Sequence, residues 1–154
     1  MIKFVRIDHR LIHGQVAFSW TNFLGTNRII VIDTEASLDE FRCMALNMSK
    51  PAGVKLNIYN VAKAIEKAKK IDELNENVML VFGSIKDTRE FVEGYPHIKE
   101  INLGGVPKKE GSKEYGPVVY LTLDEEKDLK KIAQFGTILY MQQLPTTKKE
   151  VLNL

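Results

Sequence analysis

The stretch IKFVRIDHRLIHGQV, which runs from Ile2 to Val16, decides the fold of this chain. Its opening part is mostly apolar and predicts a strand over Ile2–Ile7, whereas the apolar spacing from about Gly14 to Leu24 predicts a helix. Open α/β proteins place their chemistry where a strand turns into a helix. The turn between these two elements contains an acid, an arginine and a histidine, so it is the first candidate for a functional site.

Short apolar runs alternate with helical patterns along the whole chain. Further strands are predicted at Arg28–Ile32, Val54–Ile58, Val78–Phe82, Ile98–Leu103, Val118–Leu121 and Thr137–Met141. No linker, internal repeat or low-complexity segment divides the sequence. We therefore expect an α/β fold: a single domain over residues 1–154 with an open, twisted, mainly parallel sheet of about seven strands and helices on both faces.

Local signals place the ends and faces of the helices. The first helix is expected to have Val16, Trp20 and Phe23 on one apolar face. Ser37 precedes Glu40 by three residues, a capping-box pattern that opens a second helix. The apolar face of that helix is predicted to contain Leu38, Phe41, Ala45 and Met48. Thr122 and Glu125 form another capping box, whereas the segment Gly104–Gly111 has no periodicity and is predicted to be a loop.

Composition excludes several classes of function. The formal net charge is only +2 and acidic residues are interleaved with basic ones, so nucleic acid is not an expected partner. The single cysteine, Cys43, cannot form an internal disulfide, which fits a reducing cytoplasm. No apolar run approaches the roughly 20 residues of a membrane span, and the N-terminus does not resemble a signal peptide. We expect a cytoplasmic protein that reaches a membrane only through a partner.

No cofactor or metal ion is expected. The sequence contains neither GxxxxGK[ST] nor GxGxxG, which argues against a small nucleotide-binding α/β enzyme. Its three histidines and one cysteine do not have the spacing of metal ligands, and there is no GxSxG nucleophile motif.

The turn after the first strand has the residues that phosphoryl transfer needs. His13 is the candidate nucleophile, because a neutral imidazole nitrogen is available near neutral pH and the resulting phosphoramidate is easily passed on. Arg10 offers a planar, permanently charged fork that matches phosphate oxygens. Asp8 would orient the imidazole or Arg10. Gly14 lets the backbone approach an anion at the helix N-terminus, and Gln15 would donate to a phosphate oxygen or cap the turn.

Simpler interpretations stand beside these. A histidine in a loop is most often structural or merely exposed, and Asp8 with Arg10 would then be a surface salt bridge worth about 0–1 kcal/mol. His9 is a rival phosphate acceptor that is less well placed for the helix N-terminus.

The segment Arg6 to Val16 closely resembles the active-site signature of the IIB components of the mannose/fructose/sorbose family of the bacterial sugar phosphotransferase system, R-[IV]-D-x-R-L-I-H-G-Q-V. The likeness covers almost the whole chain. It implies a cytoplasmic phosphocarrier, a phosphotransferase of the protein-N(pi)-phosphohistidine–sugar type. Such a protein takes a phosphoryl group from its IIA partner and gives it to a sugar held by the membrane components IIC and IID. His13 matches the phosphorylated histidine, and Asp8 and Arg10 match motif positions beside it.

The resemblance also directs attention to residues outside the motif. Asp33 and Ser84 follow the second and fourth predicted strands and would face the same rim, although each is equally suited to cap a helix. Gly104 and Gly105 would shape the pocket floor or simply mark a turn. His9 stands where the family usually has a small or acidic residue, and this raises the question of a second phosphate acceptor.

Several alternatives stay open at the level of sequence. A non-catalytic module of the same fold that senses phosphate or docks a regulator is the competing function. The identity of the sugar, the imidazole nitrogen that takes the phosphate, and the oligomeric state are not set by the sequence, with a homo-oligomer among the alternatives.

Overall fold

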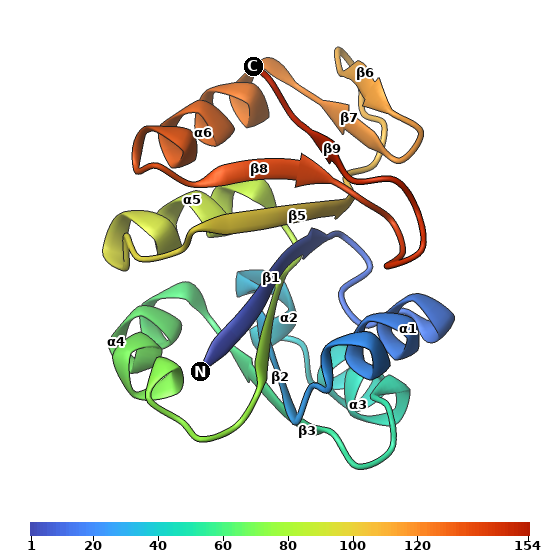
Figure 1. Ribbon diagram of the computed structural model, residues 1–154, viewed down its shortest axis with the longest axis vertical. Coiled ribbons are helices and arrows are strands. Elements are labelled where there is room, and N and C mark those ends of the chain that lie inside the picture. Colours follow the sequence, from blue (N-terminus) through green and yellow to red (C-terminus); the bar gives the residue numbers. More distant parts are fainter.

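A computed structural model describes residues 1–154, and its centre is a seven-stranded sheet with the strand order β3-β2-β4-β1-β5-β8-β9 (Figure 1). The strands are β1 (Ile2–Asp8), β2 (Arg28–Ile32), β3 (Lys55–Tyr59), β4 (Val78–Phe82), β5 (Glu100–Gly105), β8 (Ile138–Met141) and β9 (Glu150–Val151). Every pairing in this sheet is parallel except that of β8 with β9. The predicted single α/β domain with a mainly parallel sheet is therefore confirmed.

Helices cover both faces of the sheet, as predicted. The helices are α1 (Gly14–Leu24), α2 (Thr34–Ser37), α3 (Glu40–Ser49), α4 (Val61–Asp72), α5 (Ile85–Gly94) and α6 (Leu123–Gln134). Trp20, Ala36 and Leu46 of the first three helices pack with Ile29 and Val31 in one apolar cluster. The other three helices contribute to a second cluster, which contains the alternate β2 residues Ile30 and Ile32. Successive residues of a strand point to opposite faces of the sheet, so β1, β2 and β4 each contribute residues to both clusters.

The faces of α1 and α3 differ from the prediction. α3 begins after Asp39, whose carboxylate accepts a hydrogen bond from the Arg42 amide, and Ser37 instead ends α2. Leu46 is the buried residue of α3, and the row expected to face the core is exposed, with Phe41 85% exposed. On α1, Phe23 is 68% exposed while Trp20 is buried. Periodicity identified an apolar stripe on α3 correctly but did not reveal that this stripe faces away from the sheet.

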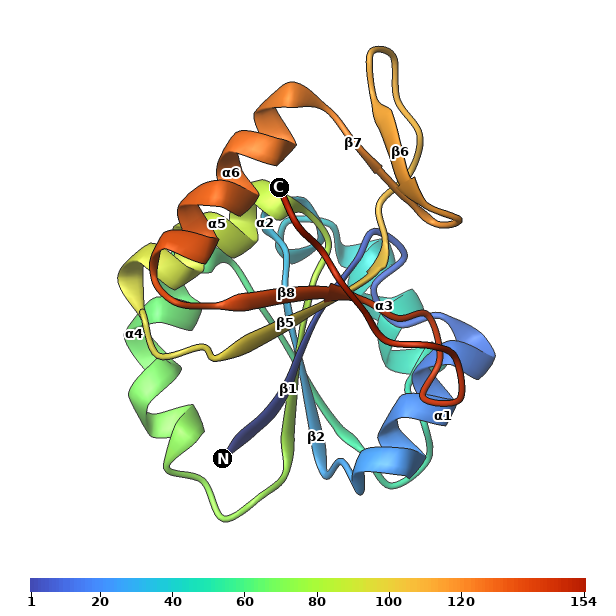
Figure 2. The ribbon, with the colours of Figure 1, turned by 45° about the horizontal axis from the view of Figure 1, so that its top comes forward.

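The chain between β5 and α6 forms a separate hairpin. Its strands are β6 (Lys113–Gly116) and β7 (Val119–Leu121), and Figure 2 shows it projecting from the body of the molecule. The strand predicted at Val118–Leu121 therefore pairs with β6 outside the main sheet. A single bridge between Val106 and Val119 joins the hairpin to the end of β5. The Thr122–Glu125 capping box at the start of α6 is confirmed, with both reciprocal hydrogen bonds present.

The strand order brings the site residues to one edge of the sheet. β1 lies between β4 and β5, and β2 lies on the far side of β4. The register pairs Ile7 with Phe82, Phe82 with Ile32, and Asp8 with Gly105. The carboxyl ends of β1, β2, β4 and β5 consequently meet, as is usual for ligand sites in open α/β sheets. No helix of this protein has the length and apolarity that a membrane span requires.

Candidate active site

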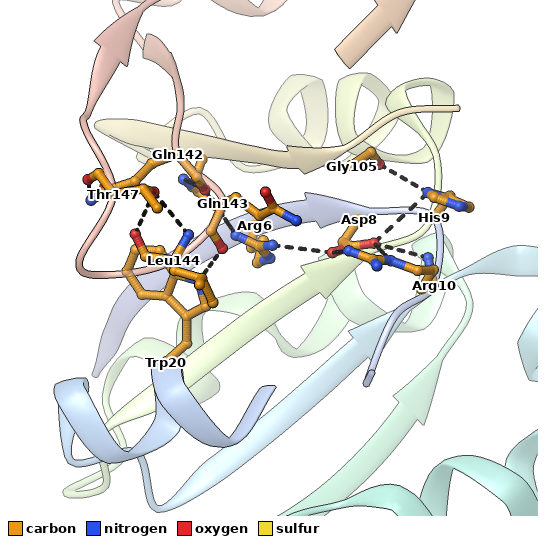
Figure 3. A network of polar contacts seen from close by, with 11 residues as sticks. Arg6, Asp8, His9, Arg10, Trp20, Gly105, Gln142, Gln143, Leu144 and Thr147 are labelled. Carbon is orange, nitrogen blue, oxygen red and sulfur yellow. Dashed lines mark hydrogen bonds and ion pairs between the residues drawn. The ribbon is translucent and has the colours of Figure 1, made fainter. Parts of the chain in front are cut away.

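Asp8 is the buried centre of the site, with an arginine on each side (Figure 3). One of its carboxylate oxygens, Oδ2, accepts from Arg6 Nη2 at 3.1 Å and from Arg10 Nη2 at 3.3 Å. The other, Oδ1, accepts from the Arg10 backbone amide at 3.0 Å and from Arg10 Nε at 3.2 Å. Asp8 is 1% exposed, so the interpretation of Asp8 and Arg10 as a surface salt bridge is wrong. The pair is a built support that fixes the Arg10 guanidinium at the rim.

The electrostatics of Asp8 agree with this role. Burial alone would raise the pKa of the Asp8 carboxyl, but hydrogen bonds from Arg10 and the charge of Arg6 outweigh burial and lower its pKa below the ordinary value. Asp8 therefore stays ionised. Burial lowers the pKa of Arg6, and the charge and hydrogen bond of Asp8 oppose that effect.

Arg6 is a part of the site to which the sequence analysis gave no role. Its side chain is 2% exposed, and its Nη1 donates to Asn102 Oδ1 at 2.5 Å and to the Gln142 carbonyl at 3.1 Å. Its guanidinium carbon lies 5.6 Å from the centre of the Trp20 ring. The available signal was a charged residue between the apolar Val5 and Ile7, but two of the partners of Arg6 lie 96 and 136 residues away in sequence.

Gly104 and Gly105 belong to β5, and the prediction that they lie in a loop is wrong. A Cβ at Gly104 would lie 1.9 Å from the Arg6 guanidinium carbon, and one at Gly105 would lie 3.1 Å from Asp8 Oδ1. These glycines leave the space that the buried charges of β1 occupy. They make room for the Arg6 and Asp8 side chains, and because both lie in a strand they do not mark a turn.

His13 stands at the N-terminus of α1 as its N-cap residue. Its side chain is exposed and makes no capping hydrogen bond, while its carbonyl accepts from the Val16 and Ala17 amides. Leu11 has a left-handed backbone with φ 61°, and Gly14 has φ 40°, which shows why glycine suits this entry to the helix. Gln15 is exposed on the first turn. The imidazole thus lies exposed at a helix N-terminus, where the first backbone amides have no partner within the helix.

Asp33 and Ser84 both cap helices, as the alternative interpretation proposed. Asp33 accepts from the Ala36 amide at 2.9 Å, and Ser84 Oγ accepts from the Asp87 amide at 3.1 Å. Burial raises the pKa of Asp33, and its hydrogen bond with the Ala36 amide opposes this. Both residues also line a cavity of about 550 Å³ that has no hydrophobic lining residue and reaches His9. The structure therefore brings these two residues together with the loop after β1.

The sequence matches the family model of the PTS system sorbose subfamily IIB component over residues 2–153. The chain belongs to this family of IIB components. The sorbose-specific EIIB component of Lacticaseibacillus casei is 31% identical over 95% of this chain and 89% of that protein. The mannose-specific EIIAB component of Escherichia coli K12 is 34% identical over 97% of this IIB chain, which spans only 46% of that longer relative.

Solved structures agree with the family assignment. The crystal structure of manxB from Thermoanaerobacter tengcongensis superimposes with a TM-score of 0.90 at 33% identity and covers 98% of this IIB chain and 92% of its own. The N-acetylgalactosamine-specific IIB component 1 from Escherichia coli superimposes with a TM-score of 0.91 at 27% identity, and the match covers 99% of this IIB chain and 100% of that structure. IIB components accept a phosphoryl group from IIA and pass it to a sugar, so this protein is a phosphotransferase of the sugar-uptake system. No three His, Cys, Asp or Glu side chains gather as a metal site.

Proposed function

We propose that this IIB component carries its phosphoryl group on His13 and that the whole of residues 1–154 is one IIB domain. The observation that supports His13 is its exposed, uncapped imidazole at the N-terminus of α1, on the loop whose Arg10 is fixed by buried Asp8. The family match over residues 2–153 supports the domain. In enzyme terms the protein is a protein-N(pi)-phosphohistidine–sugar phosphotransferase.

Loading is a direct displacement at phosphorus. A ring nitrogen of His13 attacks the phosphohistidine of IIA, the new phosphorus–nitrogen bond forms, and the old one returns its electrons to the IIA imidazole. Arg10 uses Nε and Nη2 for Asp8, which leaves Nη1 to bind the oxygens of the transferred group. Because phosphoryl transfer depends mainly on positioning and charge neutralisation, a fixed arginine and a helix N-terminus supply much of what it needs.

The other residues of the site have supporting roles in this proposal. The backbone N–H groups at Gly14 and Gln15 would bind phosphoryl oxygens, since the first amides of a helix have no partner within it. Asp33 and Ser84 hold the starts of α2 and α5 at the rim of the polar cavity. Gly104 and Gly105 act through the space that they leave for Arg6 and Asp8.

The partners follow from the same chemistry. We propose that the chain works at the cytoplasmic side of the membrane, with a IIA phosphocarrier as donor and IIC with IID as the permease that presents the sugar. No bound cofactor takes part in the proposed steps. We also propose that the chain assembles as a homo-oligomer, which analytical ultracentrifugation would test.

The test is loading from radiolabelled phospho-IIA. His13→Ala should accept no label, while His97→Ala, a change at an exposed histidine outside the loop, should load like the wild type. Full labelling of His13→Ala would overturn the proposal. Reversible anion binding without an acid-labile adduct on the wild type would instead support the non-catalytic phosphate-sensing or regulatory module.

A further inference from the structure

His9 has a fixed ring orientation that the proposed role of His13 does not explain. Its Nδ1 lies 3.3 Å from the Gly105 carbonyl oxygen and 3.8 Å from Asp8 Oδ1. A carbonyl and a carboxylate only accept hydrogen bonds, so Nδ1 is the nitrogen that carries the proton. The network therefore assigns the tautomer in which Nε2 has a free lone pair. The His9 side chain is 42% exposed, and it lines the polar cavity described above.

His9 shares its carboxylate with the arginine that binds the phosphoryl group. Asp8 Oδ1 accepts from Arg10 Nε at 3.2 Å and faces His9 Nδ1, so the imidazole and the guanidinium flank one oxygen (Figure 3). Arg42 of α3 donates to the His9 carbonyl at 3.4 Å and holds the same segment from the other side. A phosphoryl group bound by Arg10 would consequently lie next to the His9 ring.

The all-polar cavity gives a hydroxyl access to His9. His9 is one of its walls, and Ser84 and Arg42 are others. The charged groups around it are of both signs, and its carboxylates outnumber Lys86 and Arg42. The carboxylates are Asp33, Glu35, Asp87 and Glu90. A cavity of this kind suits a neutral, hydroxyl-rich group better than an apolar one.

The two half-reactions of a IIB component differ in one proton. Loading moves a phosphoryl group from one imidazole to another, and no hydroxyl proton is released. Discharge to a sugar converts a hydroxyl into a phosphate ester, so its proton must go to a base. An imidazole with a carboxylate beside its protonated nitrogen is a well-suited base, because the carboxylate stabilises the imidazolium that forms.

We propose that His9 is the general base for discharge to the sugar; this rests on the proposed function, in which His13 carries the phosphoryl group. The sugar oxygen attacks phosphorus, an oxygen–phosphorus bond forms, and the phosphorus–nitrogen bond breaks with its electron pair returning to the His13 ring. The hydroxyl proton passes to His9 Nε2 and from there to solvent, and the other ring nitrogen of His13 takes up a proton from solvent. The His13 ring therefore leaves as a neutral imidazole, and no net proton is released. Asp8 is the positioning residue, since it holds both the base and the phosphate-binding arginine.

The test separates loading from discharge in His9→Asn, whose amide can still donate to the Gly105 carbonyl but cannot accept the proton. His97→Asn is the matched control outside the loop. Each protein is loaded from phospho-IIA, and the label is then transferred either to sugar through IIC and IID or back to IIA. We expect His9→Asn to load and to return label to IIA within about threefold of wild type. Discharge to sugar should fall by about 100-fold or more in kcat with KM for the IIB chain unchanged, the range expected on losing a general base.

Three results would overturn the proposal. Unchanged discharge in His9→Asn would mean that His9 is not the base. An equal loss in loading, back-transfer and discharge would mean that His9 only supports the fold of the loop. Label on His9 in the wild type would make it an acceptor instead. None of these is the result that refutes His13, which is labelling of His13→Ala, so the two proposals fail separately.

Discussion

Replacing Gly104 by alanine should disrupt the site although no catalytic atom is changed. The new Cβ would lie 1.9 Å from Arg6 Cζ, 2.0 Å from Nη2 and 2.4 Å from Nη1. No real carbon tolerates such contacts, so the guanidinium must leave its position. Arg6 is 2% exposed and lies against Trp20, so it cannot simply turn toward solvent.

The size of the effect follows from what the guanidinium loses. Arg6 makes hydrogen bonds with Asn102, the Gln142 carbonyl and Asp8, and hydrogen bonds that involve a charged group contribute about 1.5–3 kcal/mol each. Displacing Arg6 leaves the buried Asp8 with Arg10 alone. Breaking a buried ion pair by removing one partner typically lowers the free energy of unfolding by about 3–5 kcal/mol, and we expect Gly104→Ala to fall in this range.

Urea unfolding of four proteins tests both the size of the stability loss in Gly104→Ala and its cause, the clash with Arg6. They are the wild type, Gly104→Ala, Arg6→Met and the double variant, compared at constant pH by circular dichroism. If the clash with Arg6 is the cause, Gly104→Ala should lower the free energy of unfolding much less in the Arg6→Met background, a coupling above about 1.5 kcal/mol. An equal loss in both backgrounds, or a loss below about 0.5 kcal/mol in the wild type, would refute the reasoning.

Other changes should separate the roles of neighbouring residues. Arg10→Lys should slow loading from IIA by about tenfold or more at unchanged circular dichroism, because lysine cannot contact Asp8 at two points and also bind the phosphoryl group. An unchanged rate would count against the binding of the phosphoryl group by Arg10. The pKa of Asp8 is lowered in the folded state, so the stability that its ionised form contributes is complete above about pH 4 and is lost as the pH falls further. In urea titrations below about pH 4, the unfolding free energy of Asp8→Asn should therefore fall less with decreasing pH than that of the wild type. The pKa of Asp33 is raised in the folded state, so its ionised form lowers the stability at neutral pH. Asp33→Asn should therefore raise the unfolding free energy at pH 7, and this gain should vanish as the pH falls to about 4. Phe41→Ser should change the unfolding free energy by less than about 0.5 kcal/mol, since Phe41 is 85% exposed; a larger loss by urea unfolding would show that this side chain is packed.

The sequence predicts best where one local pattern decides the structure. The alternation of apolar runs and helical spacing predicted the parallel sheet, and Thr122 with Glu125 predicted a capping box that the structure confirms. The buried faces of α1 and α3 were harder to predict from the sequence. An apolar stripe shows that a helix has two different sides, but it does not show which side packs against the sheet. The strand at Val118–Leu121 was predicted, but its hairpin partner β6 was not, because β6 is short and mostly polar and so lacks the continuous apolar run of a buried strand.

The motif around His13 is local, whereas the structure that supports it is not. Asp8 accepts hydrogen bonds from both Arg10 and Arg6, and Arg6 in turn donates to Asn102 and to the carbonyl of Gln142. This chain of hydrogen bonds holds Arg10 in place. Those last two groups lie on β5 and on the loop after β8, which Trp20 of α1 also contacts through the Gln143 carbonyl. The position of a rim arginine is thus set by the far end of the chain, and only a parallel sheet with β1 next to β5 brings these segments together. A change at Asn102 should therefore weaken phosphoryl loading although it touches neither His13 nor Arg10.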